Sequence, residues 1–112
     1  MFIALVQIPI GKRSKEEAIA SGKESAPTFF GVNGLIRKYY LNGDEGGGGV
    51  YLWESKEAAE AWYNDDWWVR MEKAFGVQPK LTYYNNDVIV DSATSELRVE
   101  GKVVALEQVA AE

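Results

Sequence analysis

The first segment of the chain restricts its fold more than any other. Residues 2–10 are apolar at nearly every position, with only Gln7 and Pro9 as interruptions before Gly11 ends the run. Such a run is typical of a strand that is covered on both faces rather than half exposed. We therefore expect a central strand around which the other elements are arranged.

A helical region follows this strand. Ser14 and Glu17 have the spacing of a capping box, which predicts a helix beginning near residue 15. Residues 25–27, Ser-Ala-Pro, look like a fresh helical start. The region 14–31 is expected to be a broken helix, or a helix followed by a shorter helical turn.

A hairpin is expected next. Residues 35–41 and 50–54 have strand patterns, and the glycine run 46–49 lies between them. Because no Gly-Lys-Ser/Thr follows the glycines and no helix starts there, we interpret the run as a flexible hairpin tip rather than a phosphate loop. Alternation along the first strand places these residues on one face: Leu35, Arg37, Tyr39 and Leu41.

The second half of the chain repeats the pattern. Ser55 caps a helix that is interrupted or recapped at 64–66 and stopped by Gly76, and a fourth strand is expected over 81–90. The order βαββαβ is that of a ferredoxin-like α+β fold. We assign residues 1–91 to this domain. Residues 92–112 are predicted to form a C-terminal extension. It is expected to be a small hairpin in which Leu97 and Val99 face Val103 and Ala105, or an arm that packs on the other subunit of a dimer.

Composition excludes several kinds of chemistry. The 112 residues carry a net charge of −5 and include no cysteine and no histidine. No thiolate nucleophile, disulfide or zinc knuckle can form, and the usual general base near neutral pH is missing. A net-acidic chain without a basic cluster is a poor nucleic-acid binder, and no apolar run is long enough to span a membrane. We expect a soluble, cytoplasmic domain.

Aromatic residues are the strongest functional signal. Four tryptophans fall within residues 53–68, and tyrosines lie on neighbouring elements. For any single ring, a place in the core is the simplest interpretation. Because buried indole N–H and phenol O–H groups need partners, however, such clusters often line a cleft. Arg37 strengthens that interpretation, since it shares a strand face with Tyr39.

Several segments together resemble one family. They are GLIRKYYL (34–41), the glycine hairpin, GVYLWES (49–55), EAAEAW (57–62) and FGV (75–77). Over roughly residues 1–91 the chain resembles the YdhR-type mono-oxygenase family, within the antibiotic-biosynthesis-monooxygenase group of dimeric α+β barrels. Residues from 92 onward do not match it. The signature is more specific for the fold than for an activity.

The resemblance implies a homodimer whose two sheets face each other, and a cleft between sheet and helices in each subunit. Relatives of this kind oxidise polycyclic phenols with dioxygen, without metal or flavin, using a Trp, an Asn and a Tyr or Arg. This chain offers Trp53 or Trp62, Asn33 or Asn64, and Arg37 or Tyr39. The missing histidine argues against the histidine-ligated haem-degrading branch.

We therefore predict a cofactor-independent monooxygenase-like protein that acts on a phenol, anthrone or quinone-related compound. The alternative is a dimeric, non-catalytic protein that binds a small hydrophobic ligand. The predicted pocket lies between the sheet and the second helix. Its catalytic candidates are Arg37, Asn33 and Trp53, and its substrate-binding candidates are Tyr39, Trp62, Trp67 and Tyr83. Arg37 is expected to stabilise an anionic, planar ligand resting on the rings.

Overall fold

The structure is a computed structural model and describes residues 1–105. Its elements are β1 (Phe2–Ile8), α1 (Lys15–Phe29), β2 (Leu35–Gly43), β3 (Gly46–Trp53), α2 (Lys56–Trp62), α3 (Asp65–Phe75), β4 (Lys80–Asn85), β5 (Val88–Asp91), β6 (Glu96–Val99) and β7 (Lys102–Val104).

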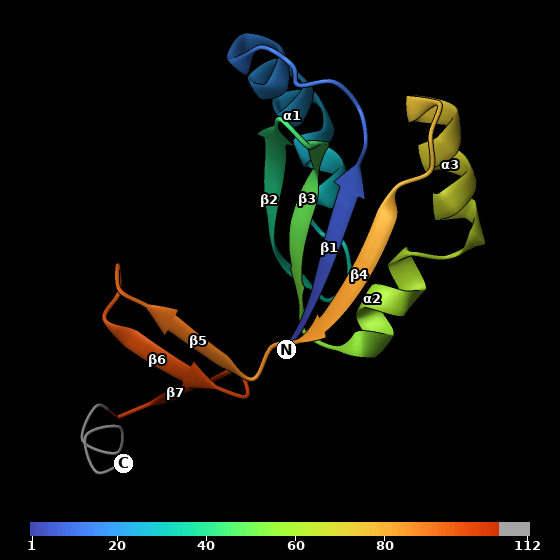
Figure 1. The fold of residues 1–112 in the computed structure, drawn as a ribbon. Helices are drawn as coiled ribbons and strands as arrows, with labels where there is room; N and C mark the ends of the chain where they lie inside the picture. The colour runs from blue at the N-terminus through green and yellow to red at the C-terminus, as the bar shows by residue number, and fades with distance from the viewer. Residues whose placement is uncertain (106–112) are drawn as a thin grey trace.

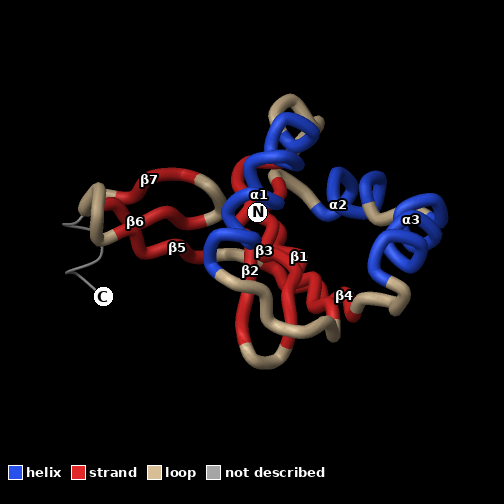
Figure 2. Tube along the Cα trace, turned by 90° about the horizontal axis from the view of Figure 1, so that it is seen from above, coloured by secondary structure: helices blue, strands red, loops and turns tan. Residues whose placement is uncertain are grey.

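The main sheet has four strands in the order β2-β3-β1-β4, and every neighbouring pair is antiparallel. The three helices lie on one side of this sheet (Figures 1 and 2). A second antiparallel sheet, β5-β6-β7, extends away from the main body; we call it the arm. The chain is thus an α+β protein with antiparallel sheets, as the sequence predicted, and is compatible with the ferredoxin-like plan.

Strand β1 is central, but its two faces differ. Phe2, Ala4, Val6 and Ile8 are buried against the helices. Ile3 and Leu5 point to the opposite, open face and are half-buried within the part of the chain that the structure describes. The apolar run is therefore not covered on both faces by residues 1–105, because all three helices pack on the same side.

Helix α1 is continuous, and the predicted break is wrong. Ser14 caps it by accepting a hydrogen bond from the Glu17 N–H at 3.1 Å, as the capping box predicted. Pro27 lies inside the last turn of the helix. A proline there removes one backbone hydrogen bond close to the helix end, so the preceding turns remain intact.

Strand β2 contains a bulge that changes its alternation. The pairing with β3 shifts between Leu35 and Arg37. Leu35 therefore lies opposite Trp53 on the helix side, together with Lys38 and Tyr40, whereas Arg37 lies on the open face. The alternation that the sequence predicted is right for Arg37, Tyr39 and Leu41 but wrong for Leu35.

The glycine run is part of a strand, and its prediction as a hairpin tip is wrong. Gly46–Gly49 pair with β2 on one side, and Gly47–Gly49 pair with β1 on the other. The turn itself is made by Asp44 and Glu45, which the Gly43–Gly46 pair encloses.

The predicted fourth strand is two strands. Residues 86 and 87 interrupt it, and the Asn86 N–H donates to the Met1 carbonyl at 2.9 Å. After this break β5 pairs with β6 instead of continuing the main sheet. The predicted C-terminal hairpin is present as β6 and β7, but Leu97 lies opposite Val104 rather than Val103. Residues 106–112 of the predicted extension lie outside the described residues.

Candidate functional site

Helix α1, the main sheet and α3 enclose a cleft of about 260 Å³, which we call the helix-side cleft. Aromatic rings form much of its wall: Phe29, Tyr40, Tyr51, Trp62 and Trp67. The Phe29 ring centroid lies 5.7 Å from that of Trp62 and 5.9 Å from that of Tyr51. Planar ligands pack well against such rings.

The charged residues of the helix-side cleft all have the same sign. Arg13, Lys38 and Arg70 line it, and none of its lining residues within 1–105 is Asp or Glu. This is unexpected in a chain of net charge −5. The guanidinium carbon of Arg70 lies 5.8 Å from the ring centroid of Trp62. A largely apolar cleft whose charged lining residues are all cations favours a ligand that is both aromatic and anionic.

Two buried donors at this cleft lack partners. The Arg13 Nε and Trp62 Nε1 atoms are buried and make no hydrogen bond within residues 1–105. The backbone of Arg13 is fixed by Asn42, which accepts from its N–H at 3.0 Å and donates to its carbonyl at 2.9 Å. A buried donor without a partner is costly, so both groups have unused capacity for a ligand acceptor.

Lys38 is the most perturbed of the three cations. Its Nζ lies 3.6 Å from the ring centroid of Phe29, 4.0 Å from that of Tyr40 and 4.8 Å from that of Tyr51. No carboxylate of residues 1–105 forms an ion pair with it. Desolvation by burial lowers the pKa of Lys38 to about 8.

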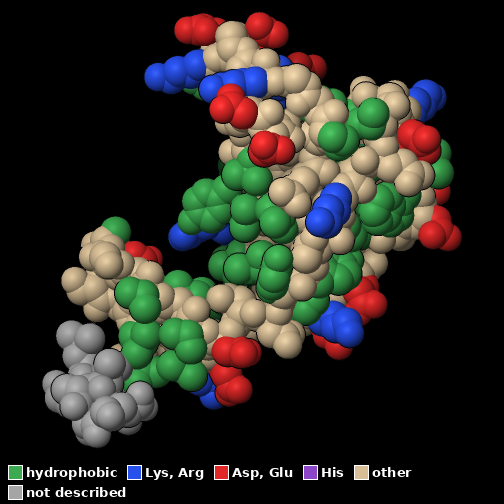
Figure 3. Space-filling view, viewed as in Figure 1, with side chains coloured by type: hydrophobic (Ala, Val, Ile, Leu, Met, Phe, Trp, Pro, Cys, Tyr) green, Lys and Arg blue, Asp and Glu red, His purple; other side chains and the backbone are tan. Residues whose placement is uncertain are grey.

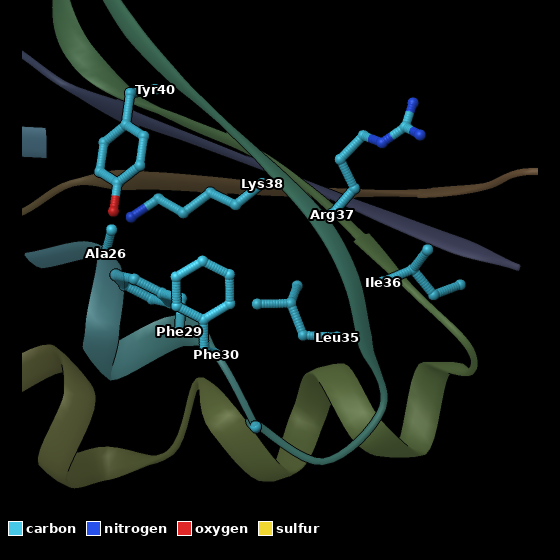
Figure 4. A pocket seen from close by; sticks show the side chains of 9 residues that line it. Ala26, Phe29, Phe30, Leu35, Ile36, Arg37, Lys38 and Tyr40 are labelled. Carbon is cyan, nitrogen blue, oxygen red and sulfur yellow. The ribbon is translucent and has the colours of Figure 1, made fainter. Parts of the chain in front are cut away.

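Lys38 also separates the helix-side cleft from a second cavity. This edge cavity, of about 250 Å³, lies between the end of α1 and the start of β2. It shares Phe29, Lys38 and Tyr40 with the helix-side cleft. Figure 4 shows the Lys38 side chain extended between the rings of Phe29 and Tyr40. The amine is thus within reach of two cavities.

The tryptophan candidates divide between cleft and core. Trp62 and Trp67 line the helix-side cleft. Trp53 is fully buried in the core instead, where its indole N–H donates to the Tyr63 hydroxyl at 3.3 Å. Tyr83 packs against Phe2 and Tyr63, with ring centroids 5.1 Å and 6.0 Å away. Trp53 is therefore a core residue and does not line the helix-side cleft.

The polar candidates are not brought together. Arg37 and Tyr39 do share a face, and Arg37 Nη1 donates to the Tyr39 hydroxyl at 3.1 Å. That hydrogen bond is the main cause of a raised Arg37 pKa. Arg37 points away from Lys38 on the other side of β2 (Figure 4), because adjacent strand residues alternate. Asn33 lines a surface hollow together with Trp62, which also lines the helix-side cleft, but neither Arg37 nor Trp53 lines that hollow.

Sequence reasoning missed the cations of the helix-side cleft. Lys38 is next to the candidate Arg37, and strand alternation could have indicated that its side chain lies on the helix side. Lys38 shares strand alternation with Tyr40, and both lie on the face that the helices cover. Arg13 and Arg70 come from the loop after β1 and from α3, so only the tertiary structure places them near Lys38.

No protein-family model matches the chain, and no curated protein is significantly similar to it. Within residues 1–105, no group of three or more Asp or Glu side chains is placed to hold a metal ion. None of the helices in this part of the chain is long and apolar enough to cross a membrane.

The first prediction concerns the pH dependence of stability. Replacing Lys38 with methionine is expected to stabilise the protein at neutral pH, since the fold desolvates an ammonium group. Between about pH 8 and the ordinary lysine value of 10.5, the folded protein binds fewer protons than the unfolded chain. The contribution of Lys38 to the free energy of unfolding therefore becomes more favourable as pH rises through this window.

Denaturant unfolding of the wild type and Lys38→Met, at about pH 7 and about pH 10, checks this expectation. The stability difference should be larger at the lower pH. Burial also raises the pKa of Tyr51 and Tyr63, but both proteins contain these tyrosines, so their effect cancels in the difference. A difference that does not change with pH would contradict the lowered pKa of Lys38.

Proposed function

We propose that this protein binds a small aromatic compound with an acidic group in the helix-side cleft, and promotes its reaction with dioxygen without metal or flavin. The observation that carries the proposal is the combination of aromatic walls with Arg13, Lys38 and Arg70, without a lining carboxylate within residues 1–105. Phenols, anthrones and quinone-related compounds have this chemistry. The resemblance to YdhR-type mono-oxygenases agrees with it.

The proposed reaction needs little from the protein. An electron-rich phenol or anthrone that loses a proton becomes an anion that can itself reduce dioxygen. The protein then has to exclude water and to place donors beside the negative charge. Guanidinium, ammonium and indole N–H groups can do this without histidine or cysteine.

A non-catalytic binding protein is the second candidate, and one observation favours it. The three residues that were predicted to be catalytic do not meet: Trp53 is in the core, Asn33 is in a surface hollow and Arg37 is on the open face. Binding of aromatic anions with no dioxygen uptake, across a panel of hydroquinones and anthrones, would favour this alternative.

The second prediction tests the charge preference of the helix-side cleft. The carboxylate 2-naphthoate should bind more tightly than the neutral amide 2-naphthamide, by about tenfold or more, since charge-assisted hydrogen bonds contribute about 1.5–3 kcal/mol. Isothermal titration calorimetry measures both affinities. In Arg13→Gln and Arg70→Gln the preference should shrink, because each variant removes one lining cation.

Lys23→Gln is the matched control, because Lys23 is exposed on α1 and does not line the helix-side cleft. It removes the same unit of charge from the protein. Equal binding of the two naphthalene compounds by the wild type would contradict the proposed site. An effect of Lys23→Gln as large as that of Arg13→Gln would show that only net charge matters.

We further propose that the chain is a homodimer of ferredoxin-like βαββαβ subunits, forming a dimeric α+β barrel through the open faces of two main sheets. Ile3, Leu5, Val50 and Leu52 lie on that face and are half-buried. Hydrophobic side chains gather over the strands and again over the arm (Figure 3). Apolar surface of this kind supports pairing with a second copy.

A further inference from the structure

We propose that the Lys38 amine is the proton acceptor of the helix-side cleft, which takes the proton of a bound phenol and then pairs with the phenolate. This inference rests on the proposed function, since it requires an acidic aromatic ligand in that cleft. It assigns a role to a residue that sequence reasoning did not select. It also supplies a base to a chain that contains no histidine.

The position of Lys38 supports this role. Across the strands it lies opposite Tyr51, on the side of the sheet that faces the helices. A side chain at position 49 would obstruct it: a Cβ built on Gly49 lies 3.2 Å from the Lys38 Cε and 3.0 Å from the Tyr51 ring. The absent side chain of Gly49 therefore leaves the space that the lysine stem uses.

The surroundings of the amine leave it available. An ammonium that is neutralised by a carboxylate would be a poor base, but no carboxylate of residues 1–105 pairs with Lys38, and its Nζ lies against the rings of Phe29, Tyr40 and Tyr51. Ring faces attract a cation without neutralising it. Burial lowers the pKa of Lys38 to about 8, so about one tenth of the amine is unprotonated at pH 7 and about half at pH 8.

The titratable and charged groups around Lys38 come from four elements or loops. Arg13 follows β1, Tyr40 is on β2, Tyr51 is on β3 and Arg70 is on α3, while Arg37 lines the edge cavity from the other side of β2. Burial raises the pKa of Tyr51, so it stays neutral across the working range of a base with a pKa near 8. The Tyr40 hydroxyl is hydrogen-bonded to the Ser25 hydroxyl at 2.8 Å. Of the groups whose pKa is shifted here, only Lys38 is moved toward neutral pH.

The step is balanced. The O–H bond of the phenol breaks and leaves its electron pair on oxygen, while the lone pair of the amine forms a new N–H bond. A neutral pair becomes an ammonium–phenolate pair, with no change in total charge. Arg13 and Arg70 line the same cleft and would stabilise the phenolate further. In the proposed function, dioxygen is the oxidant that the anion then reduces.

The test uses 2-naphthol at about pH 9, between the Lys38 pKa of about 8 and the ordinary phenol value of about 10. Ultraviolet absorption distinguishes bound naphthol from naphtholate. Calorimetry in buffers of different ionisation enthalpy counts the protons released on binding. Because Lys38 keeps the proton, the wild type should bind naphtholate and release almost none to the buffer.

Two variants separate a base from a simple positive charge. Lys38→Arg keeps the cation but is already protonated, so it should bind naphtholate and release about one proton per ligand. Lys38→Met should bind naphthol in its neutral form, about tenfold or more weakly. Lys23→Met, a change at an exposed position of α1, should behave as the wild type.

The inference is overturned if the wild type binds neutral naphthol, if it releases as many protons as Lys38→Arg, or if Lys38→Met ionises the ligand equally well. Binding of 2-naphthoate separates this failure from failure of the proposed function, since naphthoate is already ionised. A wild type that binds naphthoate but does not ionise naphthol refutes only the role of Lys38. A wild type that binds neither compound refutes both proposals.

Discussion

Replacing Gly48 with alanine should destabilise the protein by about 3 kcal/mol or more, because an L-residue is strained there and also meets backbone. Gly48 has φ +128, and a Cβ at this position would collide with the Val6 carbonyl of the central strand. Neither atom can move without disturbing the pairing of β1 with β3. Denaturant unfolding monitored by tryptophan fluorescence measures the loss.

Gly43→Ala is the matched control on the same hairpin. A Cβ at Gly43 meets nothing within 4 Å, and its φ lies outside the left-handed region. The change should therefore alter stability by about 1 kcal/mol or less. If Gly48→Ala were as stable as Gly43→Ala, the close approach of β1 and β3 at this position would be wrong.

The glycine run shows what sequence patterns can and cannot determine. Four consecutive glycines favour a loop on local propensity, which is why 46–49 was predicted as the hairpin tip. In the structure these residues are paired in β3. Glycine suits these strand positions because it has no Cβ. At Gly48 this allows the close approach of β1, and at Gly49 it leaves room for the Lys38 side chain. Both depend on neighbours that are distant in sequence.

The order of the elements was more predictable than the site. Alternation, capping residues and Gly76 indicated the order of the strands and helices of the main body and several of their ends, because these signals are local. A bulge after Leu35 changed the strand face of that residue, and nothing in the local pattern indicates it. The candidate site depends on such details, since one position separates Arg37 on the open face from Lys38 in the cleft.

The aromatic candidates illustrate the same difference. Trp53, Trp62 and Trp67 all lie on the helix side of the sheet, but only Trp62 and Trp67 line the cleft. The sequence alone does not show which of these rings line a cleft and which are packed in the core. Trp53 is fully buried, while Trp62 is half-buried at the cleft. Tertiary packing decides whether a tryptophan is buried or lines a cleft, and the residue type is the same in both cases.

The shape of the chain suggests that a partner covers its apolar surface. Its radius of gyration is 16.2 Å, compared with about 13 Å for a compact domain of this length. The arm accounts for the difference, since it extends from the main sheet (Figure 1). Val88, Val90 and Val103 on the arm are all more than half exposed. A three-stranded sheet with exposed hydrophobic side chains gains stability from a second surface that covers them.

The proposed homodimer should therefore depend on the open face of the main sheet. Val50 lies near the middle of that face, opposite Leu5 on one neighbouring strand and Tyr39 on the other. Tyr39 is 52% exposed in the single chain, so this part of the face has surface that a second copy can cover. We choose Val50→Lys as the disrupting variant and Val50→Thr as its control, since threonine keeps the branched shape that suits a strand.

In the wild type, sedimentation equilibrium at micromolar concentration should give twice the mass of one chain. Val50→Lys should weaken association by about a hundredfold or more, because each subunit would bury an unpaired ammonium at the interface, at about 3–5 kcal/mol. Val50→Thr should remain a dimer. Since residue 50 is half-buried on a face without helices, Val50→Lys should keep its far-ultraviolet circular dichroism spectrum. A wild type with the mass of one chain, or a Val50→Lys variant that stays dimeric, would show that the open face is not the interface.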